Sequence, residues 1–385
     1  MSNHQQQANH KKIGVGIIGA SPSNPGWAVA AHIPAVQALP DFQLVAVSTS
    51  NRESADAAAE AFGVPGFDNY QDLIQHPEVD LVVIAINVQY HYDIARAAIE
   101  AGKMVYSEWP LGMSTEQAQD LADRAKEAGV RTFIGLQARY SPAIQHARDL
   151  ITQGYIGNVL ATTLSGTALI WEPVTIQKFA YTYDVNAGAT MLASAGLHAI
   201  DGLNYVLGDY DNVSAKLEVR HPEVQITDNG TTLKVTAPDH MAIIGTLESG
   251  VLATTLYRSG TSRDFDLRWE IIGTDGELVI TADFNGNMQN TELKLRGGKG
   301  EDKTLGEIVI PSQYTEDIKS IPEGPARSSN IGKFYASLAK DLREGTNETP
   351  DFAHALRRHR LYDTIMTASR TGVEQKVNET NTTFH

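Results

Sequence analysis

The sequence contains no cysteine, and this absence excludes several kinds of chemistry. None of its 385 residues can form a disulfide, a thiolate metal ligand or a thiol nucleophile. Basic residues are also fewer than acidic ones. The sequence has 31 lysines and arginines and 46 aspartates and glutamates, which gives a formal net charge of −15. Since contact with a phosphate backbone needs a basic face, we do not expect nucleic acid as a direct partner.

Long apolar runs and metal-ligand spacings are also missing. No stretch approaches the ~20 apolar residues that span a bilayer, so no membrane association is expected. No H-x-x-x-H pattern is present, and we expect no metal. The N-terminal segment MSNHQQQANHKK is polar and lacks the apolar core of a secretory signal. We therefore expect a disordered tail over residues 1–12 of a cytoplasmic protein, followed by two or three domains.

Residues 13–136 alternate short apolar runs with segments of helical spacing. The runs are rich in Val and Ile, which is typical of strands buried on both faces. They cover residues 13–18, 42–47, 81–86, 104–106 and 132–135. Helical spacing lies between them, over residues 28–38, 53–61, 93–101 and 115–128. This alternation predicts an α/β domain of the Rossmann type, with a doubly wound parallel sheet.

The pattern changes from residue 137 onward. Helical spacing at 142–153 and 189–207 flanks a strand-like segment at 159–167. Further strand-like segments follow at residues 213–219, 241–247, 251–257, 267–273, 277–281 and 292–296. The pattern predicts an α+β domain over residues 137–385, in which an open antiparallel sheet carries helices on one face. Two closing helices are expected within residues 332–372.

A glycine-containing loop follows the first strand. The letters Gly14-Val-Gly16-Ile-Ile-Gly19 match G-x-G-x-x-G, but Gly14 and Gly16 lie inside the apolar run. The turn itself begins at Gly19 and continues through Ala20, Ser21, Gly26 and Trp27. Backbone N–H groups and a helix N-terminus there favour a dinucleotide pyrophosphate. The alternative is an ordinary strand-to-helix turn.

The end of the second strand bears on the choice of cofactor. An acidic residue there would bind the ribose 2′-hydroxyl of NAD, but the sequence has Ser48-Thr49-Ser50-Asn-Arg52. Hydroxyl groups and an arginine suit a 2′-phosphate, which favours NADP slightly over NAD. The alternative is a solvated loop.

Three motifs together resemble the family of glucose–fructose oxidoreductase and inositol dehydrogenase, known as Gfo/Idh/MocA. They are Ala-Gly-Lys103 with Glu108-Trp-Pro110, the turn Gly154-Tyr-Ile-Gly157, and Gly196-Leu-His-Ala-Ile-Asp201. The resemblance covers about residues 13–372. It implies a nucleotide-binding domain followed by an open sheet that a symmetry mate covers, in a homodimer or homotetramer. It also implies a cis Trp109–Pro110 bond.

The chain departs from the family pattern at three places. Trp109 stands where the family usually has a lysine, and Ser194 stands where it often has an aspartate. Ile86-Asn87-Val88 precedes His91 in place of Thr-Pro-Asn. These departures are similar to a subgroup of the family that contains a galactose-pathway repressor, which binds dinucleotide and acts as a regulator.

The resemblance implies hydride transfer between a nicotinamide and a sugar, sugar acid or polyol. Such a reaction needs a base, and histidine suits this role because its pKa lies near neutrality. His198 is the candidate base, with Asp201 on the same helical face, and the alternative is a buried structural histidine. Further residues follow by resemblance: Trp109 and Asp184 for catalysis, Trp171, Lys178, Tyr181, Tyr183 and Asp201 for substrate, and Ile86, Asn87, Val88, His91, Glu108, Trp109, Gln137 and Arg139 for the cofactor.

Two functions remain open on these grounds. The first is an NAD(P)-dependent oxidoreductase acting on a carbohydrate-like substrate. The second is a catalytically silent dinucleotide-binding sensor. Retention of His198 favours the enzyme, whereas Trp109 and Ser194 favour the sensor.

Overall fold

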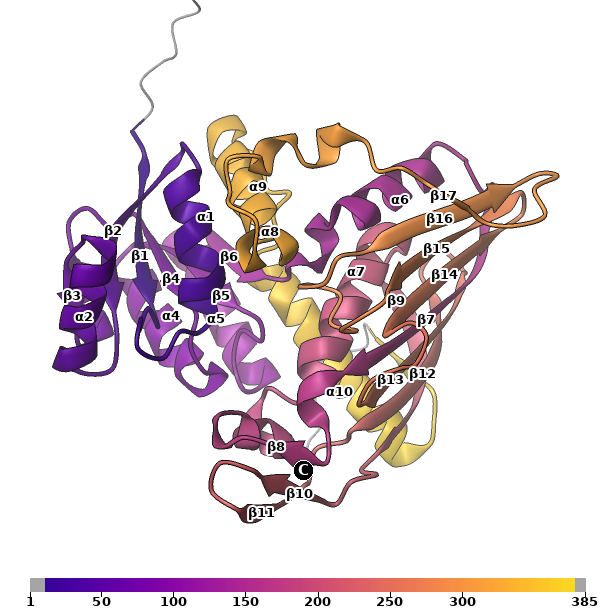
Figure 1. Cartoon of the computed structure of the whole chain (residues 1–385), viewed down its shortest axis with the longest axis horizontal. Coiled ribbons are helices and arrows are strands. Elements are labelled where there is room, and N and C mark those ends of the chain that lie inside the picture. The colour runs from indigo at the N-terminus through magenta and orange to yellow at the C-terminus, as the bar shows by residue number, and fades with distance from the viewer. Residues whose placement is uncertain (1–10, 378–385) are drawn as a thin grey trace, which may run out of the picture.

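The computed structural model describes residues 11–377, so the tail expected over residues 1–12 lies almost entirely outside the described residues. The N-terminal part holds a six-stranded parallel sheet, drawn in indigo and violet in Figure 1. Its spatial order is β3-β2-β1-β4-β5-β6, which confirms the predicted doubly wound fold. The strands are β1 (Ile13–Ile18), β2 (Phe42–Ser48), β3 (Gly66–Phe67), β4 (Leu81–Ile84), β5 (Met104–Glu108) and β6 (Thr132–Gly135).

Helices cover both faces of this sheet, and local capping explains where they begin. Asn51, Asn69 and Ser114 each accept a backbone N–H of the first helical turn with their side chains. The helical segments are a π-helical turn (Ala28–His32), α1 (Ile33–Ala38), α2 (Arg52–Phe62), α3 (Tyr70–Gln75), α4 (His91–Glu100) and α5 (Thr115–Ala128). The short β3 and α3 were not predicted from the sequence.

The C-terminal part holds a nine-stranded sheet. Its order is β17-β16-β15-β14-β7-β13-β12-β9-β18, and its pairs are antiparallel except β7 and β13, which run parallel. The predicted open antiparallel sheet is therefore confirmed in outline and corrected at this one pair. The strands are β7 (Val159–Ala168), β9 (Tyr210–Glu218), β12 (His240–Leu247), β13 (Leu252–Ser259), β14 (Leu267–Gly273), β15 (Gly276–Ala282), β16 (Lys294–Lys299), β17 (Gly306–Glu307) and β18 (Gln375–Lys376).

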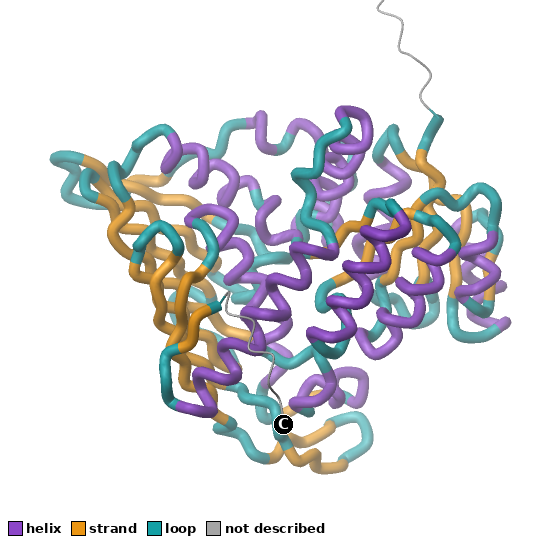
Figure 2. The backbone as a smooth tube through the Cα atoms, turned by 180° about the vertical axis from the view of Figure 1, so that it is seen from behind, coloured by secondary structure: helices purple, strands orange, loops and turns teal. Residues whose placement is uncertain are grey.

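Five helices of the C-terminal part pack on the inner side of this sheet or reach back to the first domain. They are α6 (Pro142–Thr152), α7 (Leu197–Leu207), α8 (Pro325–Ser328), α9 (Ile331–Glu344) and α10 (Phe352–Thr371). Figure 2 shows these helices between the two sheets. Helix α9 packs against α1, and α10 packs against both α5 and β9, so the closing helices join the two domains. Within residues 11–377 no helix is long and apolar enough to cross a bilayer.

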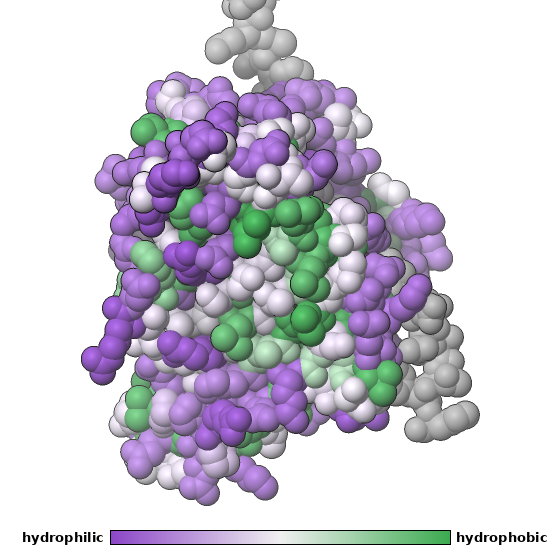
Figure 3. Space-filling model, turned by 90° about the vertical axis from the view of Figure 1, so that its right-hand side faces the viewer, coloured by the Kyte–Doolittle hydropathy of each residue, from purple (hydrophilic) through white to green (hydrophobic). Residues whose placement is uncertain are grey.

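The outer face of the large sheet carries no helix, and apolar side chains gather at its centre (Figure 3). Leu160, Ile244, Leu252, Leu256 and Ile272 are each 40–55% exposed there. Alternation along β12 and β13 turns every second side chain outward, and cross-strand pairing brings those from neighbouring strands together.

A third, three-stranded sheet lies below the space between the domains in Figure 1 and was not predicted. It consists of β8 (Val174–Thr175), β10 (Glu223–Ile226) and β11 (Thr231–Lys234), in the order β11-β10-β8. Its strands are short and mostly polar, so the sequence offers little apolar alternation to indicate them.

Candidate functional site

A cleft of about 700 Å³ opens at the carboxyl ends of β1, β2 and β4. In a doubly wound sheet this edge is where ligands bind. Seven of the residues predicted for the cofactor line the cleft, namely Gly19, Ser21, Gly26, Thr49, Ser50, Ile86 and Asn87. The structure thus brings the glycine loop, the end of the second strand and the end of the fourth strand together.

Gly19 shows why this turn needs a glycine. Its φ is +100°, and a Cβ there would lie 2.5 Å from the carbonyl oxygen of Ala85. The loop therefore passes close to the end of β4 and leaves its backbone facing the cleft. Gly26, at the other end of the loop, has open space around it. An elongated anionic ligand with a diphosphate fits this cradle.

The second strand does not present the arginine that was expected at the cleft. Arg52 lies in the first turn of α2, where its guanidinium donates to Asp56 Oδ1 at 2.9 Å and to the carbonyl oxygen of Gly66 at 2.8 Å. Arg52 does not line the cleft, whereas Asp68, which follows β3, does. The preference for NADP, which was based on Arg52 in the sequence, is therefore weakened.

Three of the predicted cofactor residues are buried and do not line the cleft. Ala20 and Val88 are buried, and neither lines it. The ring of His91 is buried between two carbonyl oxygens, with Nδ1 2.8 Å from that of Pro110 and Nε2 3.0 Å from that of Ile86. Burial lowers the pKa of His91. The ring connects the loop after β4 to the turn after β5.

Glu108 ends β5, the strand next to β4, and its carboxylate is held from several sides. His32 Nε2 lies 3.0 Å from Oε1, and the hydroxyl of Tyr106 donates to the same oxygen at 3.0 Å. His32 Nδ1 in turn lies 2.9 Å from the hydroxyl of Tyr335 in α9. Gly135 makes room for the carboxylate, because a Cβ there would lie 2.7 Å from Oε1.

Trp109 occupies the domain junction with its only donor in use. The Trp109–Pro110 bond is cis, as predicted. The indole N–H donates to the carbonyl oxygen of Ala193 at 2.6 Å, and the ring lies 4.8 Å from that of the buried His359. Ala193 belongs to a second π-helical turn (Leu192–Gly196), which precedes α7. Trp109 therefore presents aromatic surface but no free hydrogen-bond donor.

His198 lies in the first turn of α7 and is 5% exposed. Its Nδ1 is buried and has no hydrogen-bond partner among the described residues. Burial lowers the pKa of His198 to about 4, although the carboxylates of Glu108 and Asp201 act in the opposite direction. The imidazole is therefore neutral at pH 7 and able to accept a proton. Gln137, also predicted at this junction, is buried and leaves its Oε1 without a partner among residues 11–377.

Asp201 and Arg139 form an ion pair with each other, and neither lines the cleft. The guanidinium of Arg139 donates to both carboxylate oxygens of Asp201, at 2.6 and 3.0 Å. His354 Nε2 and Arg358 Nε of helix α10 lie 2.6 and 3.2 Å from Oδ1. Burial opposes ionisation of Asp201, but the charges of Arg139, His354 and Arg358 hold its pKa well below the ordinary value. The carboxylate has no exposed surface.

The segment predicted to contact substrate is anchored by its aromatic side chains. Trp171 and Tyr183 are buried, and both donate to backbone carbonyls within the segment, the indole to Thr182 and the hydroxyl to Ile170 and Glu172. Asp184 accepts the backbone N–H of Asn186 in an exposed turn. Tyr181 is 36% exposed. Lys178 instead lines the cleft at the carboxyl ends of β1, β2 and β4, called the dinucleotide cleft below.

Several site residues were missed by the sequence reasoning. Asp68, Asn69, Tyr70 and Gln71 line the cleft beside the second strand, and Tyr90 and Asp93 line it at the start of α4. The Asp-Asn pair before a short helix is a capping signal that could have indicated the first group. His32 and His359 support Glu108 and Trp109 from distant parts of the sequence, and no local pattern identifies them.

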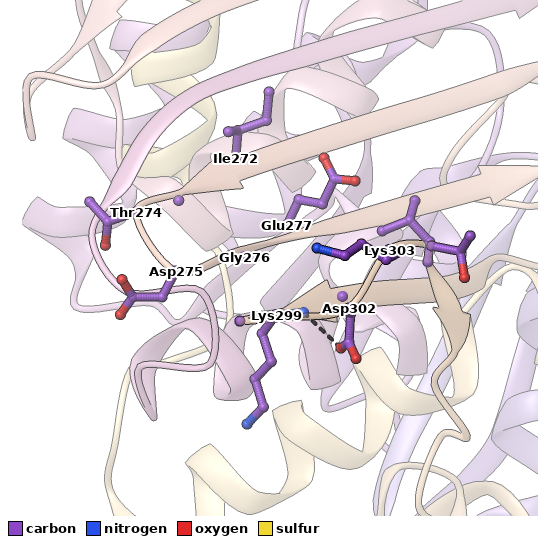
Figure 4. Close-up of a pocket in the computed structure, with 13 residues that line it drawn as sticks. Ile272, Thr274, Asp275, Gly276, Glu277, Lys299, Asp302 and Lys303 are labelled. Carbon is purple, nitrogen blue, oxygen red and sulfur yellow. Dashed lines mark hydrogen bonds between the residues drawn. The ribbon is translucent and has the colours of Figure 1, made fainter.

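A second hollow, of about 370 Å³, lies between the turns of the β14–β15 and β16–β17 hairpins (Figure 4). Its side chains include Asp275, Lys299 and Asp302, and the backbone N–H of Lys299 donates to Asp302 at 3.0 Å. It contains none of the predicted site residues. The described residues contain no group of three or more His, Asp or Glu placed to hold a metal ion.

Known proteins resemble both halves of this chain. Residues 13–136 match the profile of the oxidoreductase family with an NAD-binding Rossmann fold, and residues 142–282 match the C-terminal domain of Gal80p. The dehydrogenase aclE of Aspergillus oryzae is 30% identical over 282 residues, which span 70% of this chain and 77% of that protein. The chain belongs to this oxidoreductase family. The resemblance to the Gfo/Idh/MocA proteins is thereby confirmed.

Other known proteins resemble the chain over almost its whole length. The galactose/lactose metabolism regulatory protein GAL80 of Saccharomyces cerevisiae is 30% identical over 375 residues, 89% of this chain and 85% of that protein. A super-repressor mutant of Gal80p has the same fold, with a TM-score of 0.84 at 25% identity over 95% of this chain and 98% of that one. Levoglucosan dehydrogenase of Pseudarthrobacter phenanthrenivorans is 26% identical over 376 residues, 89% and 92% of the two chains. The proteins that this chain resembles therefore include both dehydrogenases and a regulatory protein.

Proposed function

We propose that the protein is an NAD(P)-dependent oxidoreductase acting on a sugar, sugar acid or polyol, with His198 as the acid/base. The observation that carries the proposal is the buried imidazole of His198, whose Nδ1 has no partner among the described residues and whose helix is joined to the end of β5 by the hydrogen bond from Trp109 to Ala193. Glu108 ends β5, and β5 neighbours β4, which ends at the cleft. Glu108, whose charge acts on His198, thus ends at the same edge of the sheet as the cleft.

Each residue of this site has a separate role in the proposed reaction. A bound nicotinamide supplies the hydride acceptor for oxidation of a hydroxyl-bearing carbon. The imidazole of His198, which its lowered pKa keeps neutral at pH 7, accepts the hydroxyl proton. Glu108 is fixed by His32 and Tyr106, so its charge stabilises the protonated form of His198. Trp109 offers an apolar surface for the C–H face of a carbohydrate.

For the cofactor we propose NAD rather than NADP, a revision of the preference drawn from the sequence. Arg52 is committed to Asp56 and Gly66, and the carboxylate of Asp68 lines the cleft. A carboxylate accepts hydrogen bonds from ribose hydroxyls and repels a 2′-phosphate.

A regulator that binds dinucleotide without turnover is the second candidate. Trp109 favours it, because its only donor is used by Ala193 and it cannot provide the charged hydrogen bond of a lysine. The relatives named Gal80 are described as regulatory proteins.

We also propose three features of the setting in which the protein works. The domain division lies between residues 136 and 137, and the cysteine-free chain functions in the cytoplasm. The open face of the large sheet is covered by a second copy in a homodimer or homotetramer. The cluster of exposed apolar side chains on that face supports the last proposal.

Replacement of His198 by Asn tests the assignment of the base. The variant is expected to lose about 10² to 10⁴ in kcat, as removal of a general base does, while NADH affinity is retained. His76→Asn, a change at a partly exposed histidine of the first domain, serves as the matched control. Full activity of His198→Asn would exclude His198 as the base.

A further inference from the structure

The dinucleotide cleft is poor in positive charge. Among the described residues that line it, Lys178 is the only basic one, and Asp68 and Asp93 carry negative charge. A cation beside the diphosphate adds charge-assisted hydrogen bonds to those that backbone N–H groups supply. Arg52, the nearest basic candidate in the sequence of the first domain, is engaged by Asp56.

Lys178 belongs to the second domain, in the 3-10 helical segment Gln177–Tyr183. Its ammonium forms no hydrogen bond or ion pair with any residue from 11 to 377. It nevertheless lines the same cleft as Gly19, Ser21 and Gly26 of the phosphate loop. An unpaired cation of one domain therefore lines the same cleft as the anion cradle of the other.

The backbone beside Lys178 is held by the small sheet. The N–H of Gln177 donates to both carboxylate oxygens of Asp228, at 2.9 and 3.2 Å, and the side chain of Asn229 donates to Gln177 Oε1 at 2.9 Å. Asp228 and Asn229 form the turn between β10 and β11. The N–H of Thr227 donates to the carbonyl oxygen of Thr175 at 2.8 Å, which joins the same turn to β8. The turn thus fixes the start of the segment that carries the lysine.

We propose that Lys178 binds the diphosphate of the dinucleotide from the second domain, and that the β10–β11 turn is the support that positions it. This inference rests on the proposed dinucleotide binding and adds a cation to it. The ligand then contacts both domains at once, through the backbone of the glycine loop on one side and an ammonium on the other.

Titration of the full-length protein with NADH and NADPH, followed by their fluorescence, tests the proposal. Lys178→Met is expected to raise the Kd for both nucleotides by about five- to tenfold at low salt, with less effect at high salt. Lys178→Arg should keep most of the affinity. Lys234→Met is the matched control, because Lys234 is an exposed lysine on β11 of the same small sheet and does not line the cleft. ADP-ribose, used as a competitor, should lose affinity with Lys178→Met, whereas adenosine should not.

A double-mutant cycle tests the supporting role of the turn. Asp228→Ala removes the acceptor of the Gln177 N–H, so it should weaken NADH binding two- to threefold alone and add nothing in the Lys178→Met background. Unchanged affinity in Lys178→Met, or an equal loss in Lys234→Met, would overturn the proposal. A loss confined to NADPH would place the lysine at the ribose phosphate and overturn the diphosphate assignment. If the wild-type protein binds neither nucleotide, the proposed function itself fails.

Discussion

Replacement of Asp201 by Asn should destabilise the protein strongly while leaving ligand contacts in place. The Asp201 carboxylate is fully buried and is shared by Arg139, His354 and Arg358, which come from the domain junction and from α10. Asparagine keeps one acceptor oxygen but removes the negative charge, so Arg139 remains buried without a counterion. Removal of one partner from a buried ion pair costs about 3–5 kcal/mol, and retention of one oxygen places this substitution near 3 kcal/mol.

Urea unfolding followed by circular dichroism measures this free energy directly. Asp56→Asn is the matched control, because Asp56 pairs with Arg52 at an exposed position where such a pair contributes about 0–1 kcal/mol. The double variant Arg139→Met/Asp201→Asn should lose less than the sum of the single variants, because the unpaired arginine is gone.

Two results would refute this reasoning. If Asp201→Asn lowers the free energy of unfolding no more than Asp56→Asn does, the buried network does not stabilise the domain junction. If the variant is fully stable but loses affinity for a carbohydrate ligand, Asp201 contacts the substrate, as the sequence reasoning first proposed.

Three further predictions concern other parts of the molecule. Burial lowers the pKa of His359 to about 4 against an ordinary 6.5, so the stability that its neutral ring contributes is fully present above pH 6.5 and is lost as the pH drops toward 4. Between pH 7 and 5, His359→Asn should therefore lose about 2 kcal/mol less of its free energy of unfolding than the wild-type protein loses, measured by urea unfolding at both values. An unchanged pH dependence would contradict this. Trp109→Phe leaves the carbonyl of Ala193 without its donor and should lower the free energy of unfolding by about 1–2 kcal/mol in the same assay, and an unaltered value would show that this hydrogen bond does not contribute. Leu256→Glu should shift the protein toward monomer in light scattering after gel filtration, unlike Val373→Glu at an exposed site in the bend between α10 and the edge strand β18. An intact oligomer in both variants would place the interface elsewhere.

Much of the fold follows from patterns that are local in the sequence. Apolar runs and helical spacing placed the long strands and helices of both domains, including α10 at residues 352–371. Short polar elements escaped this reasoning, because β3, β8 and the β10–β11 hairpin have too few apolar residues to show a period. The parallel pairing of β7 and β13 escaped it as well, since strand direction depends on how distant segments meet.

Site residues could be predicted where they belong to a local sequence motif, but not where the fold brings distant segments together. The turn at Gly19 was found because a strand-to-helix turn in an alternating domain has a recognisable place. Arg52 was assigned to the cofactor from its position in the sequence, but the neighbouring Asp56, one helical turn away, competes for its charge. The approach of Lys178 to the cleft depends on the packing of two domains, which no local pattern expresses.

The most direct test of the central claim is absorbance at 340 nm of the purified protein mixed with NAD and a panel of aldoses, uronic acids and polyols. The proposed function predicts that NADH forms with at least one of them, and that formation slows by about 10² to 10⁴ in His198→Asn. Tight binding of NADH without turnover on any member of the panel would contradict the enzyme and support the regulator.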